Sequence, residues 1–161
     1  MRHVPALLLP ALAGVCLLAG CASAAPPVDE DALHDWKSAQ DAAVETEADV
    51  LGVLQGDIGP GNDLSDAEPT VTLQFPASQY LDHLEFSCYG NGQMRGQVRT
   101  VTERGAQSVE LDEMACNDSP HRITLSRSAR DAVDSVAFTG TDSDRSSAWR
   151  LVIVGPGPSG D

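Results

Sequence analysis

The chain has 161 residues, with 24 acidic and 10 basic side chains and a formal net charge of −14 at pH 7. This balance argues against binding to DNA or RNA, because proteins that recognise nucleic acid present a basic face to the phosphates. The length is enough for a short export segment followed by one domain of modest core.

Residues 1–20 have the layout of a secretory signal. Met1-Arg2-His3 is a short basic start, and the apolar run up to Leu18 is shorter than the ~20 residues that a membrane-spanning helix needs. Leu18-Ala19-Gly20-Cys21 looks like a lipobox, the motif at which a diacylglycerol is attached to the cysteine thiol and the chain is cut just before it. We therefore expect a lipoprotein on the extracytoplasmic face of the cell membrane, with the bilayer as the partner of acylated Cys21.

Two other fates of the N-terminus remain open. Ala22-Ser23-Ala24 is also an A-x-A cleavage site, and cutting after Ala24 would release a soluble secreted domain. Alternatively, the signal stays uncut and anchors the protein itself.

Residues 21–28, with Pro26-Pro27, are expected to form an extended tether, and residues 29–55 an acidic amphipathic helix. Asp29 can cap this helix, and the next two acidic residues suit its N-terminal dipole. Spacings of three or four residues place Leu33, Trp36 and Val50 on one thin apolar stripe, which is a candidate docking face. Residues 56–69, rich in Gly, Asp, Asn and Pro, predict a linker.

The pattern changes to strict alternation over residues 70–154, which predicts a mainly β fold: an antiparallel β-sandwich of about seven to eight strands. Seven alternating sets carry this expectation: Val71/Leu73/Phe75, Leu84/Phe86/Cys88, Met94/Gly96/Val98, Val109/Leu111, Ile123/Leu125, Val136/Phe138 and Trp149/Leu151/Ile153.

Asn91-Gly92 predicts a hairpin turn, and the change of apolar parity after Leu111 predicts a bulge or turn at Asp112-Glu113. Trp149 is expected to point into the core. Residues 155–161 predict a disordered tail.

Two cysteines of the exported part remain once Cys21 carries lipid. Cys88 and Cys116 lie 28 positions apart and predict one disulfide. A redox or metal pair is the alternative, but there is no C-x-x-C spacing and no histidine beside either cysteine. We expect neither a metal nor a cofactor.

Several of these features together resemble those of small actinobacterial envelope lipoproteins. They are the lipobox, an acidic helix carrying Trp36, the stretch FSCYGNG (Phe86 to Gly92), Cys116 and a last strand AWRLVIV (Ala148 to Val154). The resemblance implies an envelope location and a β-sandwich that is cross-linked by cysteines and follows a tether. It implies no activity and no catalytic residue.

The sequence holds no G-x-S-x-G and no H-E-x-x-H motif, and no set of acid, base and nucleophile converges in it. We therefore expect a protein that is not an enzyme, a binding or envelope-associated module for a protein, glycan or small ligand. The alternative is an accessory subunit that docks a membrane complex through the helix at 29–55. In that case the face of Leu33, Trp36 and Val50 would be left uncovered by its own domain.

Overall fold

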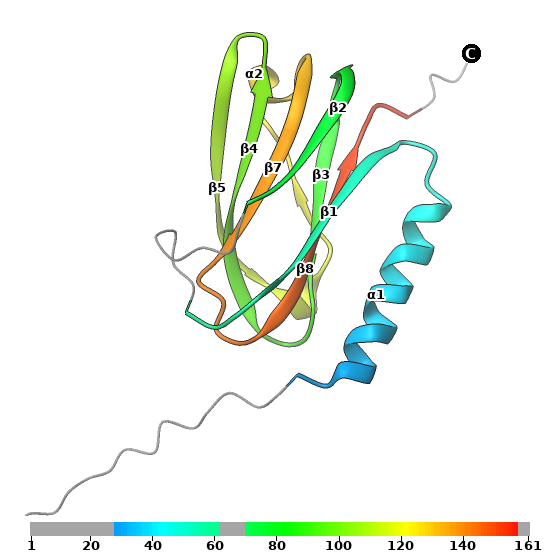
Figure 1. Ribbon diagram of the computed structural model, residues 1–161, viewed down its shortest axis with the longest axis vertical. Helices are drawn as coiled ribbons and strands as arrows, with labels where there is room; N and C mark the ends of the chain where they lie inside the picture. Colours follow the sequence, from blue (N-terminus) through cyan, green and yellow to red (C-terminus); the bar gives the residue numbers. More distant parts are fainter. Residues whose placement is uncertain (1–27, 62–69, 158–161) are drawn as a thin grey trace, which may run out of the picture.

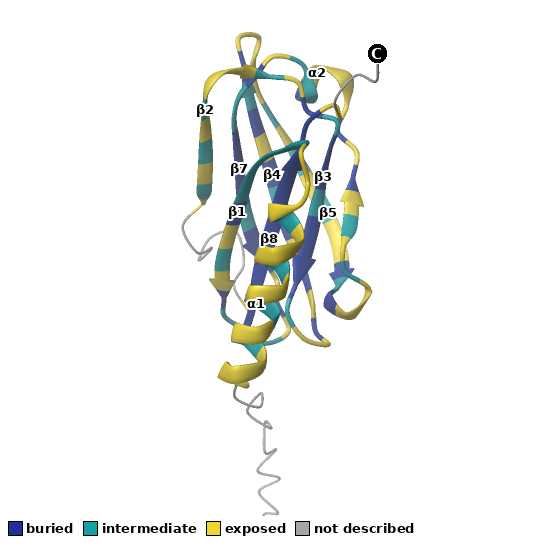
Figure 2. Cartoon of the chain, turned by 90° about the vertical axis from the view of Figure 1, so that its right-hand side faces the viewer, coloured by how far each residue is buried: buried dark blue, intermediate teal, exposed yellow. Residues whose placement is uncertain are grey.

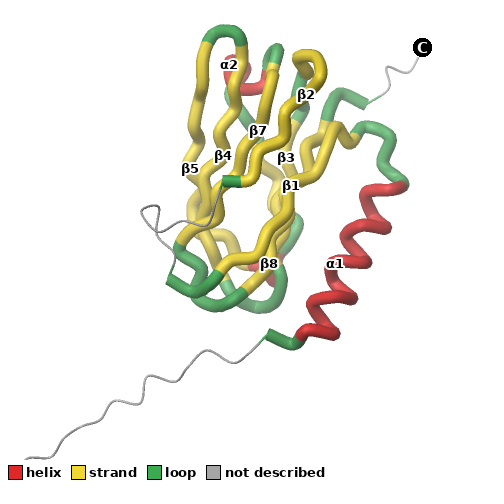
Figure 3. The backbone as a smooth tube through the Cα atoms, viewed as in Figure 1, coloured by secondary structure: helices red, strands yellow, loops and turns green. Residues whose placement is uncertain are grey.

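The computed structural model describes residues 28–61 and 70–157. Within these ranges the chain forms two antiparallel sheets packed face to face, with one long helix outside them (Figures 1 and 3). The elements in chain order are α1 Glu30–Glu45, β1 Val50–Ile58, β2 Val71–Gln79, β3 His83–Cys88, β4 Gln93–Thr102, β5 Gly105–Ala115, a 3-10 turn η1 Cys116–Asp118, β6 His121–Ile123, α2 Arg127–Arg130, β7 Val133–Thr141 and β8 Ser147–Val154. The mainly β sandwich is therefore confirmed.

One sheet has the strand order β1-β8-β3-β6 and the other the order β2-β7-β4-β5. The core lies between them, and its centre is a run of three aromatic rings. Phe138 of the second sheet contacts both Phe86 and Trp149 of the first, with ring centroids 5.3 and 4.6 Å apart. Trp149 thus points inward, as expected.

The seven alternating sets all lie in or beside the strands β2 to β8, but the eighth strand, β1, was not expected. The prediction of one helix over 29–55 and a linker from residue 56 is wrong for the residues between Glu45 and Ile58. The helix ends at Glu45, and residues 50–58 pair with the whole of β8. Gly52 and Gly56 disfavour a helix here, and the branched Val50 and Val53 favour a strand. Pairing with β8 then prevails over the helical spacing.

The N-terminal end of α1 was predicted correctly. Asp29 caps it, with its side chain accepting a hydrogen bond of 3.1 Å from the backbone N–H of Ala32. Glu30 and Asp31 occupy the first turn, where negative charge is favourable. At the other end, the hydroxyl of Thr46 donates to the carbonyl of Ala43.

The turn at Asn91-Gly92 exists, but it forms no hairpin. The strands on either side of it, β3 and β4, lie in different sheets, so the turn carries the chain from one layer to the other. The positive φ expected there occurs at Gly90, at 92°. The sequence shows that a tight turn is needed but not that the next strand joins the other sheet.

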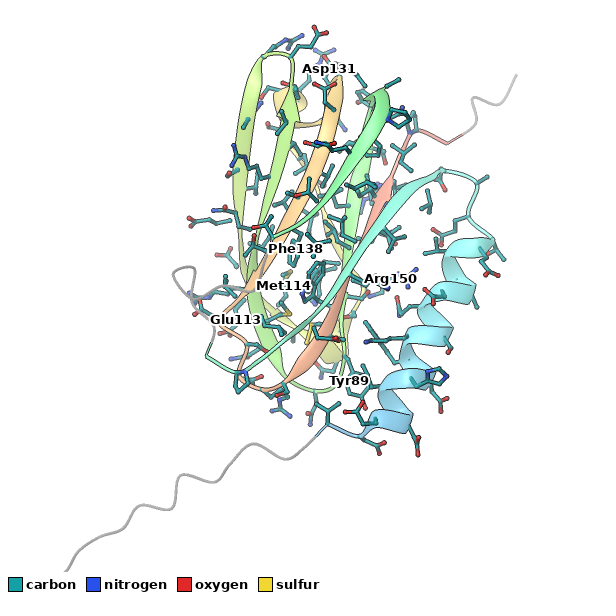
Figure 4. All side chains as sticks on the ribbon, viewed as in Figure 1. Tyr89, Glu113, Met114, Asp131, Phe138 and Arg150 are labelled. Carbon is teal, nitrogen blue, oxygen red and sulfur yellow. A yellow bond between two sulfur atoms is a disulfide. The ribbon has the colours of Figure 1, made fainter. Side chains whose placement is uncertain are left out.

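The expected bulge at Asp112-Glu113 is confirmed. Met94 of β4 pairs with Met114 of β5, whereas Gly96 pairs with Leu111, so one residue of β4 faces two of β5. Figure 4 shows Met114 pointing toward the core side of the strand and its neighbour Glu113 away from it.

The disulfide between Cys88 and Cys116 is also confirmed. Cys88 ends β3 in one sheet, and Cys116 follows β5 in the other, so the bridge joins the two layers. Both cysteines are buried.

Four predicted segments lie wholly or partly outside the described residues. They are the signal at 1–20, the tether at 21–28 (of which only Val28 is described), the linker at 56–69 (described up to residue 61) and the tail at 155–161 (described up to residue 157). The first tail residue is not disordered: Gly155 is buried, and its N–H donates to the carbonyl of Asp49. No helix in the described ranges has the length and apolar character needed to cross a bilayer.

Candidate binding site

Helix α1 lies against the outer face of the sheet that holds β1 and β8 (Figures 1 and 2). The helix is exposed along most of its surface, and a half-buried stripe faces the sandwich: Leu33, Trp36, Lys37, Gln40 and Val44. None of its residues is fully buried. By contrast, every residue of β8 is buried, including those on the outer face of the sheet. The helix therefore covers the sheet without becoming part of the core.

The candidate docking residues are separated by this arrangement. Leu33 and Trp36 lie on the half-buried side of α1, and the indole of Trp36 meets the ring of Tyr89 edge-on at 6.0 Å. Val50 is not on the helix at all; it begins β1 and pairs with Val154. The prediction that these three residues share one helical face is wrong, because the chain changes from helix to strand between them.

Polar contacts hold the helix to the sheet. Lys37 and Asp57 form an ion pair at 3.0 Å, with 42% and 74% of their side chains exposed. The hydroxyl of Tyr89 lies 3.5 Å from the carbonyl oxygen of Asp29. Exposed pairs of this kind each contribute about 0–1 kcal/mol. The helix is therefore held weakly compared with the strands.

The most unusual residue beneath the helix is Arg150, in the middle of β8. Its side chain is only 5% exposed, and Figure 4 shows it projecting from the sheet toward α1. The Nη1 group donates to Asp41 of the helix, whose side chain is 64% exposed. The Nε group is buried and has no hydrogen-bond partner among the described residues. A buried donor without a partner is costly, so such a group requires an explanation.

Two hollows flank the ion pair between helix and sheet. The first, of about 190 Å³, is lined by Trp36, Lys37, Gln55, Gly56, Asp57, Trp149 and Arg150. The second, of about 380 Å³, lies toward the start of α1 and includes Val28 and Leu33. Both share Lys37 and Asp57, so the ion pair bridges a single crevice. We call this space, with both hollows, the helix–sheet crevice.

Sequence reasoning missed the residues that form this site, apart from Trp36 and Trp149. One signal was available: Arg150 is the only charged residue in the last strand, and alternation with Trp149 and Leu151 places it on the outer face. That this face is covered by α1 follows only from the three-dimensional arrangement.

A second polar cluster lies on the same sheet, at the start of β3. Buried His83 has its Nδ1 2.8 Å from Asp82 and its Nε2 3.1 Å from Glu85. Arg122 also contacts Asp82, at 3.1 Å. Both ring nitrogens thus lie within hydrogen-bond distance of the protein's own carboxylates. The cluster is a polar network among side chains of the sheet.

The hydrogen bond from His83 lowers the pKa of Asp82, and the charges of His83, Arg122 and Arg130 lower it further, against a smaller opposing effect of burial. A carboxyl with a lowered pKa in the folded state stabilises the fold above its unfolded pKa of about 3.9. This stability is lost as the pH falls through the folded pKa. We therefore expect Asp82→Asn to lower the urea midpoint at neutral pH, with the gap to wild type closing below about pH 4. A gap that stays constant with pH would contradict this origin.

Replacing Trp36 by alanine is expected to lower the melting temperature by several degrees. The change removes an aromatic pair worth about 0.5–1.5 kcal/mol, together with some buried apolar area. His34→Ala is the matched control, since His34 is exposed on the same helix and should change the melting temperature little. Thermal unfolding followed by circular dichroism measures both. An unchanged melting temperature for Trp36→Ala would mean that the stripe does not pack on its own sandwich.

The described ranges contain no group of three or more His, Cys, Asp or Glu side chains placed to hold a metal ion. Comparison of the chain with models of known protein families gives no match, and comparisons with curated proteins and with solved structures give none either.

Proposed function

We propose that this protein is an extracytoplasmic lipoprotein, anchored through acylated Cys21, that binds a small ligand in the helix–sheet crevice without catalysing a reaction. The observation that carries the binding role is Arg150: a buried guanidinium with an unpartnered Nε, at a crevice lined in part by Trp36. Unpaired buried donors in a concave site are typical of groups that complete their hydrogen bonds with a ligand.

The disulfide supports the extracytoplasmic part of the proposal. Disulfides form and persist in exported proteins and are rare in the reducing cytosol. The Cys88–Cys116 bridge is buried and joins two sheets, which is the role of a structural bond and not of a redox switch. Cys21 and the signal lie outside the described residues, so the anchor rests on the lipobox and on the resemblance to actinobacterial envelope lipoproteins.

The non-enzymatic part rests on the state of the histidines. His83 is held between two carboxylates, and His121 Nε2 lies 2.7 Å from the carbonyl oxygen of Ala115. His34 is exposed on α1. This supports a binding module over a hydrolase.

In this proposal the crevice lies near the membrane, because the tether is short. Residues 21–27 separate the lipidated cysteine from Val28, which lines the larger hollow. Seven residues span at most about 25 Å even when fully extended. Because the first turn of α1 is acidic, we expect it to be repelled from an anionic bilayer, so that the crevice stays open to solvent.

Labelling with radioactive fatty acid in the native host tests the anchor. We expect wild-type protein to carry label and to fractionate with membranes, and Cys21→Ala to lose both properties. Intact mass of the mature N-terminus separates the alternatives, since cleavage after Ala24 yields a soluble chain without Cys21. Label that persists in Cys21→Ala would overturn the lipoprotein proposal.

The binding role is tested separately by a thermal-shift screen of small molecules against the full chain in non-ionic detergent. We expect at least one chemical class to raise the melting temperature of wild type and to lose this effect in Arg150→Lys. If every stabilising molecule acts equally on both proteins, the crevice is not the binding site.

A further inference from the structure

The guanidinium of Arg150 offers two parallel donors on one edge. In any arginine, the Nε–H and one N–H of Nη2 point the same way and match the two oxygens of a carboxylate. In this structure Asp41 accepts a hydrogen bond from Nη1, which lies on the other side of the guanidinium. Nε has no partner, and no hydrogen bond joins Nη2 to a described residue. The edge that fits a carboxylate is therefore the one left vacant.

We propose, building on the binding role above, that the helix–sheet crevice takes a small carboxylate carried on a flat apolar body, with Nε and Nη2 of Arg150 donating to its two oxygens. Asp41, on α1, accepts from Nη1 of the same guanidinium and leaves this edge vacant.

The residues that line the smaller hollow favour a ligand with an apolar body. Both tryptophans of the chain, Trp36 and Trp149, line the smaller hollow. Between them runs the bare backbone of Gly56, where an added Cβ would lie 2.8 Å from the Trp149 ring. This contact lies on the core side of the sheet, where the Trp149 ring also meets Phe138. Trp36 is the aromatic residue on the helix side of the hollow, so a flat ring can lie against it, and about 190 Å³ limits the ligand to a small one.

The electrostatic balance favours one added anion over a larger, multiply charged one. Arg150 and Lys37 are already balanced by Asp41 and Asp57. A single carboxylate on the vacant edge of Arg150 would compete only with Asp41. A phosphate monoester would bring about twice the negative charge into the same space.

The ligand must move helix α1 to reach its donors, because Nε is buried. The helix is able to move: it has no fully buried residue, and its ion pair Lys37–Asp57 is largely exposed. Outward motion of α1 would open the crevice while the two sheets stay packed. The helix thus acts as a lid over the Arg150 edge.

Intrinsic fluorescence reports on this site, since Trp36 lines it and Trp149, the only other tryptophan of the chain, lies beneath it on the core side of the sheet. We would titrate the full chain in non-ionic detergent with benzoate and, as a neutral isostere, benzamide. Benzoate is expected to change the fluorescence with a millimolar or lower dissociation constant, and benzamide to bind about tenfold more weakly or not at all. Equal binding of the two would overturn the carboxylate assignment.

Variants then test the donor edge. Arg150→Lys keeps the charge but loses the paired N–H groups, and should weaken benzoate binding about tenfold. Arg99→Lys is the matched control, because Arg99 is exposed on β4 of the other sheet, and it should bind like wild type. Asp41→Asn should bind benzoate more tightly, since it removes the competing carboxylate. Unchanged affinity in Arg150→Lys would overturn the proposal.

The outcomes separate this inference from the binding role itself. If neutral or cationic molecules perturb both tryptophans and carboxylates do not, the crevice binds a ligand but the carboxylate assignment fails. If Arg150→Lys does not fold, Asp41→Asn and the comparison of benzoate with benzamide on wild type still decide the question. If no carboxylate changes the fluorescence, the inference is overturned whatever the lipidation assay gives.

Discussion

Replacing Phe138 by alanine is expected to lower the free energy of unfolding by about 3–5 kcal/mol. The ring is fully buried and lies between Phe86 and Trp149 of the opposite sheet. Its removal leaves a cavity that two rigid rings and two hydrogen-bonded sheets cannot close. The cost therefore includes lost contacts as well as lost burial.

Urea unfolding followed by tryptophan fluorescence measures this loss, with a second series followed by circular dichroism in case the local change alters the signal of Trp149. Phe75→Ala is the matched control. Phe75 lies on the edge strand β2 and is only half-buried, so the same truncation should cost less than half as much. Equal losses for the two variants would mean that the aromatic run is not the centre of the core.

The second large effect is expected from the disulfide. The double variant Cys88→Ala/Cys116→Ala should lose about 3–4 kcal/mol, the chain-entropy value for a loop closed over 28 residues. The bridge also joins the two sheets, so its loss frees one layer from the other at the end that carries the Asn91-Gly92 turn. For a small domain this is a substantial part of the total stability.

Reduction provides the control for this prediction. A reducing agent should lower the urea midpoint of wild type to that of the double variant and leave the variant itself unchanged. If reduced wild type keeps its midpoint, the stability of the sandwich does not depend on the bridge.

The sequence predicted most of the sandwich because alternation is a direct consequence of strand geometry. It predicted the bulge at Asp112-Glu113 for the same reason, since an extra residue reverses the parity. It failed at Val50–Ile58, where apolar residues also fit helical spacing. The glycines and branched residues there favour a strand, and pairing with β8, almost a hundred residues away, decides between the two interpretations. It failed again at Asn91-Gly92, because a tight turn does not specify which sheet receives the next strand.

The candidate site was much less predictable. Trp36 and Trp149 stand out in any sequence with few aromatic residues, but nothing local links them. They meet at one hollow because α1 covers the strand that carries Trp149, and this packing depends on contacts such as Lys37 with Asp57 that are too weak to leave a sequence pattern. The sequence shows Arg150 as an isolated charge in an apolar strand. It does not show that this side chain is buried.

The proposed anchor at Cys21 would have a mechanical consequence, because of the order in which the elements follow it. A pull on the N-terminus reaches α1 first and β1 second. The helix is fixed to the sheet by side-chain contacts, whereas β1 is fixed by a backbone ladder along the full length of β8. The helix should therefore peel away under a force that leaves the sandwich intact. In the proposed lipoprotein, tension on the tether would then expose Arg150, so that the proposed ligand site would respond to load.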